Sequence, residues 1–402
     1  MLIIEKQINF IVGIFLLSNL YFLNNLIGVS REVLIISLLV ISFIFFLKNY
    51  SSKLLTLLGT QLVLIFFLLS FVFFLLNLAL KSYEVNANDI VRVIGYMFFF
   101  GWTFSLYRHN MKSLRRYLTR LIELLLIIIV LMSIVEYYYY NIFRSFLVGE
   151  EIDVVGGVRL AVTYMDPNSF ASALAVYLFI HLSINGYSLK GILVVLVISV
   201  LINLTGSRLG LLLLVIILFH NIKKINLTFK FVKTGLFFLF VLLGFYLASL
   251  GFSSEENEYK SVSAFDRFFN SEFEDKSKAS SDERINSLID GYSSLNLSNF
   301  FFPAGGFFFK AKWEREVNAR HYPHSSFLYL IVEYGIYAIL PIFIFLKLYL
   351  RSRISKLKSL YLLLFLQLLL LPNAMYYATI YLIIFFIEIN YEYSCNSTFV
   401  EK

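Results

Sequence analysis

The chain has 402 residues, of which 59% are hydrophobic and 15% are charged. This balance excludes an ordinary soluble domain, in which about a quarter of the residues are charged. The formal net charge of +8 does not indicate a nucleic-acid partner, because the basic residues lie in short connections between apolar blocks. A single cysteine, Cys395, excludes an internal disulfide and a multi-thiolate metal site.

Apolar blocks follow one another along the whole chain, and most are long enough to cross a hydrocarbon core of about 30 Å as a helix. We therefore predict an all-α polytopic membrane bundle of about twelve transmembrane helices. The first block has no small-residue cleavage site, so we expect a retained helix and not a signal peptide. The predicted spans are 8–27, 33–47, 54–80, 90–107, 118–140, 163–184, 190–204, 207–220, 234–251, 325–347, 357–371 and 374–390.

Basic residues divide unevenly between the two sets of short connections, and this asymmetry favours a topology with both termini in the cytoplasm. The inner connections contain Arg108, Lys112, Arg115, Arg116, Arg120, Lys223, Lys224, Lys230, Lys233, Lys347, Arg351, Arg353, Lys356 and Lys358. The short outer connections contain Arg31, Lys81, Arg144, Arg159 and Arg208. The tyrosine run 137–140 then falls at an outer boundary, where amphipathic rings prefer the headgroup level.

One connection, 252–322, is much longer than the others and lies outside the membrane in this topology. We therefore divide the chain into nine transmembrane helices in 1–251, this large extracytoplasmic loop, and three further helices with a cytoplasmic tail in 323–402.

A short helix is predicted within the large loop. Ser280 and Glu283 match a capping box at its start. An apolar stripe with helical spacing follows, made of Ile285, Leu288, Ile289 and Tyr292. Such a stripe rests either on the membrane surface or on the helix bundle, and the sequence leaves both alternatives open.

Several polar side chains that lipid should expel lie near the outer ends of the predicted spans. They are Arg92, Glu136, Arg159, Asp166, Asn168, Arg208 and His324. An ionisable residue inside a span is costly and usually faces a cavity or a charged partner. Arg92 is either a phosphate-binding arginine or an ion-pair partner of Glu136.

Two arginines are candidates for binding an anion. Arg159 precedes a predicted helix start at which Asp166 suits the N-cap and Pro167 the first helical position, so capping is the alternative role of Asp166. Arg208 lies in a tight turn between two glycines, where a phosphate can come close. For both arginines, snorkelling to lipid headgroups is the alternative. Together they suit a diphosphate, because the guanidinium fork binds phosphate oxygens bidentately.

The large loop ends in a segment that contains two of the five histidines, His321 and His324. Imidazole titrates near neutrality, so it can accept a proton from a sugar hydroxyl or donate one to a leaving oxygen. The alternative for both residues is an interfacial histidine bonded to water or to the backbone.

The sequence contains no Walker A loop, no H-E-x-x-H or G-x-S-x-G motif and no spaced Cys/His cluster. The acidic run 150–153 is better explained as a solvated loop than as a cation site. We therefore expect no metal and no cofactor, with arginines taking the place of a metal if phosphate is the leaving group.

Three motifs follow one another on the predicted outer face. They are G-V-R at 157–159 with D-P-N-S-F-A at 166–171, G-S-R-L-G at 206–210, and P-H-S-S-F-L at 323–328 with E-Y-G-I at 333–336. In order and spacing they resemble the motifs of the O-antigen polymerase and O-antigen ligase superfamily of polytopic membrane proteins. Arg284, upstream of a glycine pair, is similar to a further loop arginine of that family. Two departures are Ser325, where asparagine is common, and Leu209, which separates Arg208 from Gly210.

The resemblance implies a bacterial inner-membrane enzyme that transfers glycan from undecaprenyl diphosphate to a lipid-linked repeat unit, for O-antigen, lipopolysaccharide or capsule. It implies that Arg159 and Arg208 neutralise the departing diphosphate, that Arg284 closes over them, and that His324 activates or positions the acceptor hydroxyl. The further substrate-binding candidates are Asp166, Asn168, Arg92 and His321. The implied partners are the lipid-linked donor and acceptor and the bilayer, and a chain-length regulator protein is compatible with them.

Two alternatives stay open. An O-antigen ligase would use the same donor with a different acceptor. A lipid-linked oligosaccharide flippase, or another secondary transporter, would also explain many spans with buried charge. Transporters usually show internal repeats and interrupted helices, which this sequence does not clearly contain.

Overall fold

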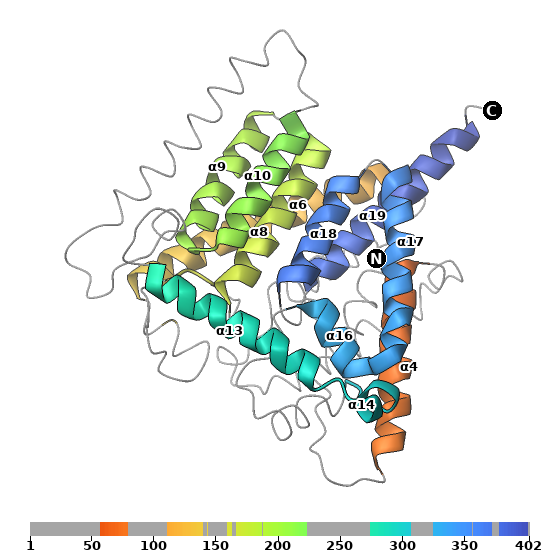
Figure 1. The fold of residues 1–402 in the computed structure, drawn as a ribbon. Coiled ribbons are helices and arrows are strands. Elements are labelled where there is room, and N and C mark those ends of the chain that lie inside the picture. Colours follow the sequence, from red (N-terminus) through yellow and green to blue (C-terminus); the bar gives the residue numbers. More distant parts are fainter. Residues whose placement is uncertain are drawn as a thin grey trace. The chain divides into compact units, whose positions relative to one another are not determined.

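The computed structural model describes residues 57–78, 111–139, 143, 159–162, 166–186, 188–222, 274–306, 325–355, 357–371 and 378–400. Within these ranges every regular element is a helix and no strand is present, so the all-α fold class is confirmed there. The helices, shown in Figure 1, are α4 (Leu58–Leu78), α6 (Met111–Tyr138), α8 (Pro167–Asn185), α9 (Leu189–Leu204), α10 (Arg208–Ile222), α13 (Glu274–Ser293), α14 (Leu297–Phe301), α16 (Ser326–Tyr334), η4 (Gly335–Ala338), α17 (Ile339–Ile354), α18 (Lys358–Leu370) and α19 (Ala378–Val400).

Four helical segments of the described residues are long and apolar enough to cross a membrane: Leu58–Asn77, Leu118–Tyr138, Pro167–Asn185 and Ser326–Ile354. Shorter apolar helices cover Leu189–Leu204, Arg208–Leu218 and Lys358–Leu370. These helices therefore have the length and composition of membrane-spanning helices. The count of twelve spans stays a prediction, because the predicted spans 8–27, 33–47, 90–107 and 234–251 lie outside the described residues.

The other predicted spans fall on described helices; most differ only at their ends, but the predicted span 325–347 is divided by η4 into α16 and α17. α17 continues past the predicted end to Ile354, and Arg351 and Arg353 in its last turn complement the negative C-terminal end of the helix. In the large loop, α13 begins at Glu274, so the predicted start at Ser280 is wrong.

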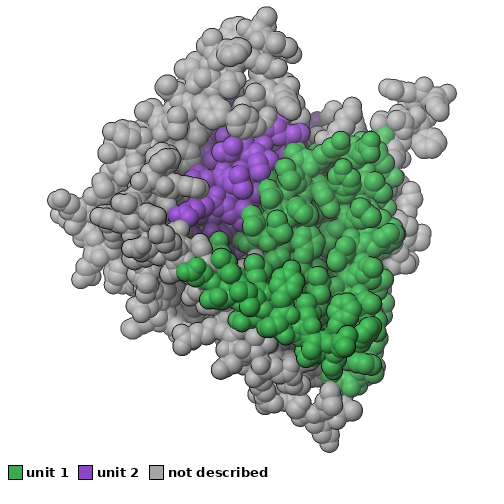
Figure 2. Space-filling model, in the orientation of Figure 1, with its two compact units in different colours: residues 1–17, 29–114, 280–402 green, residues 18–28, 115–279 purple. Residues whose placement is uncertain are grey.

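The chain divides into two compact units, coloured separately in Figure 2. Unit 1 comprises Met1–Leu17, Val29–Leu114 and Ser280–Lys402, and unit 2 comprises Ser18–Gly28 and Arg115–Ala279. Among the candidate residues that the structure describes, those in unit 2 are Arg159, Asp166, Asn168 and Arg208, whereas Arg284 belongs to unit 1.

In unit 2, α8 packs against both α9 and α10 (Figure 1). Every residue of α8 from Ser169 to Leu182 is buried. A Cβ atom added at Gly210 of α10 would lie 2.6 Å from the Cβ of Ala171, so the two helices touch closely through small residues, as membrane helices often do. Because α9 reverses the chain between them, α8 and α10 run parallel and begin at the same end of the unit.

In unit 1, the buried Glu388 of α19 ties three helices together. Its carboxylate accepts the Leu58 N–H at the start of α4 at 3.2 Å and forms an ion pair with Arg351 of α17. At the opposite end of α17, Gly335 has a φ of +57° where α16 gives way to η4. A Cβ there would collide with the backbone carbonyl of Phe300, so glycine is required for α14 to pack on this turn.

Candidate anion-binding site

The N-terminus of α8 is closed by the side chain that precedes it. Asp166 Oδ2 accepts the Ser169 backbone N–H at 2.8 Å and the Ser169 hydroxyl at 3.0 Å, and Pro167 occupies the first helical position. Asn168 Nδ2 donates to Asp166 Oδ1 at 3.2 Å. Asp166 is therefore the N-cap of α8, and it also orients the Asn168 amide so that its oxygen is available to other donors.

The turn between α9 and α10 brings a second helix start to the same place. Ser207 Oγ accepts the Gly210 N–H at 3.1 Å and donates its proton to Asn168 Oδ1 at 2.9 Å. Gly206 has a φ of +61°, a conformation that glycine adopts without strain. Arg208 follows as the half-buried first residue of α10. The starts of α8 and α10 are thus joined by one side-chain hydrogen bond.

The guanidinium of Arg159 lies against this turn. Its Nε donates to the carbonyl of Thr205 at 2.9 Å, and one Nη donates to the carbonyl of Gly206 at 3.4 Å and to Asn168 Oδ1 at 3.5 Å. A cation at the carbonyl end of a helix is favoured by the helix dipole. Main-chain carbonyls at the end of α9 therefore fix the direction of this planar group.

Glu136, near the end of α6, holds the backbone that follows Arg159. The carboxylate is buried and accepts the Val162 N–H at 2.7 Å and the Ala161 N–H at 3.2 and 3.3 Å. Val162 has a φ of +49°, which is strained for a β-branched residue. The short segment 159–162 is thus held in an unusual conformation between a buried carboxylate and the α9 end.

The structure brings together four of the candidate residues: Arg159, Asp166, Asn168 and, at the start of α10, Arg208. Arg284 is exposed on α13 in unit 1. Arg92, His321 and His324 lie outside the described residues, so their predicted roles and the ion pair of Arg92 with Glu136 stay predictions.

Two residues gain importance from the structure. Glu136 was a candidate for an ion pair, and the structure shows that it accepts backbone amides of Ala161 and Val162. A carboxylate in an apolar span is unusual, so the sequence identified Glu136 as notable, but it did not indicate what Glu136 binds. Ser207 precedes a predicted helix, so a cap could be predicted from sequence, whereas its bond to Asn168 could not.

This end of unit 2 brings together the positive ends of α8 and α10 and the negative C-terminal end of α9. Two parallel helices begin side by side, and the N-terminal end of each carries a partial positive charge. Arg159 and Arg208 add two full positive charges, against the negative charges of Asp166 and Glu136. Among the described residues, no group of three or more His, Cys, Asp or Glu side chains could hold a metal ion.

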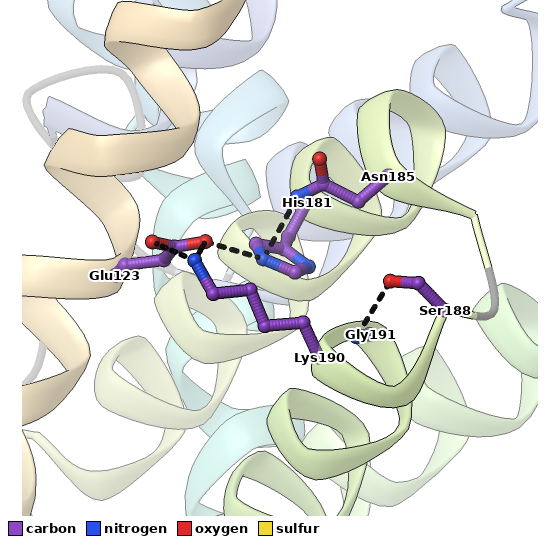
Figure 3. A network of polar contacts seen from close by, with 6 residues as sticks. All are labelled: Glu123, His181, Asn185, Ser188, Lys190 and Gly191. Atoms are coloured by element: carbon purple, nitrogen blue, oxygen red, sulfur yellow. Dashed lines mark hydrogen bonds and ion pairs between the residues drawn. The ribbon is translucent and has the colours of Figure 1, made fainter.

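A second polar cluster lies toward the other end of α8 (Figure 3). Glu123 of α6 contacts the buried His181 Nε2 at 3.3 Å and the Lys190 ammonium at 2.9 Å, and Asn185 Nδ2 lies 3.0 Å from the same imidazole nitrogen. Nearby, Ser188 caps α9 by accepting the Gly191 N–H at 3.2 Å. None of these residues was a site candidate. Glu123 joins α6 to α8 and α9 through side chains, whereas the Asn185 and Ser188 contacts lie within α8 and at the start of α9.

Comparisons of this chain with models of protein families, with curated proteins and with solved structures found no match. The resemblance to the polymerase and ligase superfamily therefore depends on the motifs, their order and their spacing. Of these motifs, the segments 157–159, 166–171 and 206–210 contribute residues to the anion-binding site.

Proposed function

We propose that this chain is a surface-polysaccharide polymerase of the bacterial cytoplasmic membrane, a metal-independent glycosyltransferase with a lipid-diphosphate donor. The proposal includes about twelve transmembrane helices and cytoplasmic termini, so that the anion-binding site faces outward. One observation carries it: the starts of α8 and α10 are joined through Asn168 and Ser207, beside Arg159 and Arg208.

A diphosphate leaving group explains why cations and helix starts would gather at a membrane boundary. Negative charge develops on the diphosphate as its bond to the sugar breaks, and oriented donors stabilise that charge best when they are already in place. The Arg159 guanidinium is oriented by two main-chain carbonyls, so it needs little rearrangement during the reaction. A lipid-linked phosphate also has a fixed depth, at the headgroup level where the helices begin.

In the proposed reaction, the acceptor hydroxyl oxygen attacks the anomeric carbon of the donor sugar. A new glycosidic C–O bond forms, the C–O bond to the diphosphate breaks, and the lipid diphosphate leaves with the bonding electron pair. His324 accepts the proton of the hydroxyl. Arg159 and Arg208 bind the diphosphate, Arg284 closes over it, and Asp166, Asn168, Arg92 and His321 line the substrate site. Donor and acceptor are both undecaprenyl-diphosphate-linked oligosaccharides.

The test uses the full chain in liposomes, with an undecaprenyl-diphosphate-linked oligosaccharide as the only glycan. We expect a ladder of longer chains on a gel, and a loss of about 100-fold or more in rate for Arg208→Lys, because a point charge cannot replace the bidentate fork. His324→Ala should also abolish the ladder. Arg353→Lys is the matched control: this exposed arginine ends α17 outside the site, and its variant should keep the wild-type rate.

The proposal fails if the reconstituted wild-type chain forms no glycosidic bond, or if Arg208→Lys and His324→Ala both keep the wild-type ladder. Movement of the labelled lipid across the liposome without chain growth would instead favour the transporter alternative. Transfer to a different, non-repeating acceptor alone would favour the ligase.

A further inference from the structure

The second half of α13 has three distinct faces. Successive residues of a helix are about 100° apart, so Ser287 and Gly291 lie on one side and Ile285, Ile289 and Tyr292 lie nearly opposite. The small residues are buried, whereas the three large apolar residues are exposed, Ile289 by 58% and Tyr292 by 68%. Asn286 and Ser293 are polar and exposed on a third side, whereas the exposed Asp282, seven residues before Ile289, lies in line with the apolar residues.

The sequence left open whether the apolar stripe rests on the membrane or on the helix bundle. The described helices of unit 1 leave these three residues exposed, whereas a stripe packed on those helices would be buried. A helix with protein on one side, apolar residues on the second and polar residues on the third fits the boundary between lipid and water.

The segment 303–305, which follows α13 and α14, contacts the end of α4. The Asn77 side-chain amide, in the last turn of α4, donates to the carbonyls of Pro303 and Ala304 at 3.4 and 3.3 Å. Gly305 packs against Phe73 so closely that a Cβ on it would lie 2.6 Å from the Phe73 Cβ. Leu58–Asn77 has the length and composition of a membrane span, so the contacts of Asn77 place 303–305 beside one end of that candidate span.

Exposed apolar side chains continue from α4 onto α14. Near the end of α4, Leu75 and Leu76 are more than half exposed, as expected for a surface in lipid. In α14 and just after it, Leu297 is 79% and Phe302 71% exposed. Phe302 directly precedes the segment bound to Asn77, so its ring lies at the level where α4 ends.

We propose that the second half of α13, together with α14, is an interfacial membrane anchor. Its apolar residues Ile285, Ile289, Tyr292, Leu297, Phe301 and Phe302 insert into the lipid surface beside the end of α4. This membrane contact is independent of the transferase proposal. The surface fits the acyl-headgroup boundary of a bilayer, because its apolar side chains are exposed and α14 leads directly into the segment that contacts the end of a candidate spanning helix.

The test places one nitroxide spin label at a time on the full chain in phosphatidylcholine liposomes, after Cys395→Ser removes the native cysteine. Ile289→Cys and Phe302→Cys report on the apolar face. Asn286→Cys, one turn away on the polar face, is the matched control, and Ser287→Cys reports on the buried face. Collision with oxygen, which concentrates in lipid, is compared with collision with a water-soluble nickel chelate.

We expect the ratio of oxygen to nickel collisions to be several-fold higher at Ile289→Cys and Phe302→Cys than at Asn286→Cys. Ser287→Cys should collide with neither reagent, which shows that the helix is folded in place. The proposal is overturned if Ile289→Cys and Phe302→Cys give the ratio of Asn286→Cys, because the stripe would then lie in water. It is equally overturned if both are shielded from both reagents, because protein, such as a second copy of the chain, would then cover them.

Discussion

The two ends of α8 hold their polar groups in different ways. At the start of α8, Glu136 accepts two backbone amides, and Arg159 donates to two backbone carbonyls as well as to the Asn168 side chain. About 20 Å further along the helix, Glu123, His181 and Lys190 contact one another through side chains alone (Figure 3).

We therefore expect the start of α8 to be rigid and its other end to adapt to substitutions. A backbone amide or carbonyl that loses its buried partner cannot turn to water without moving the chain, so the first end should be rigid and sensitive to substitution. The Lys190 side chain is 68% exposed and can bind water instead of Glu123. The second end should therefore tolerate substitution.

The largest effect is expected for Glu136→Ala. The variant leaves the buried N–H groups of Ala161 and Val162 without their acceptor, and we expect the free energy of unfolding to fall by roughly 3 kcal/mol. Unfolding in mixed detergent and dodecyl sulfate micelles, followed by circular dichroism, measures it. Glu136→Gln keeps one acceptor oxygen and should lose less than half as much. If the alanine variant were as stable as the wild type, the start of α8 would not be rigid.

A smaller effect is expected for Gly210→Ala, which tests how closely the two helix starts must approach. The added methyl group meets Ala171 at 2.6 Å, so α8 and α10 must separate, at about 2 kcal/mol. The same unfolding measurement applies. Leu212→Ala is the control in the same helix; this residue is 46% exposed, and its truncation should cost about 0.5 kcal/mol or less. Equal losses in the two variants would mean that the close contact is not needed.

The smallest effect is expected for Lys190→Ala, at the opposite end of α8. Exposed ion pairs contribute little, so we expect a change below about 1 kcal/mol in the free energy of unfolding. Glu123→Ala is the companion variant, and it should cost more because Glu123 also contacts the buried His181. If Lys190→Ala destabilised the chain as much as Glu136→Ala, the contrast between the two ends would disappear.

The sequence determined those features that depend on neighbours along the chain. Apolar blocks predicted the helices α4, α8, α9, α10 and α18 to within a few residues, because a helix in lipid must satisfy its own backbone. The Asp166 and Pro167 pair predicted the start of α8, since a cap acts on the next turn only. The start of α13 was missed, because a capping box inside a longer helix matches the same pattern.

The tertiary structure alone decided which distant groups meet. The bond from Ser207 to Asn168, the Arg159 contacts at the end of α9 and the Glu136 carboxylate beneath 161–162 all join residues from different helices or turns. The exposed side of α13 was also decided by packing, because helical spacing shows that a stripe exists but not what it faces. Periodicity and capping act over a few residues, whereas these contacts depend on how whole helices pack.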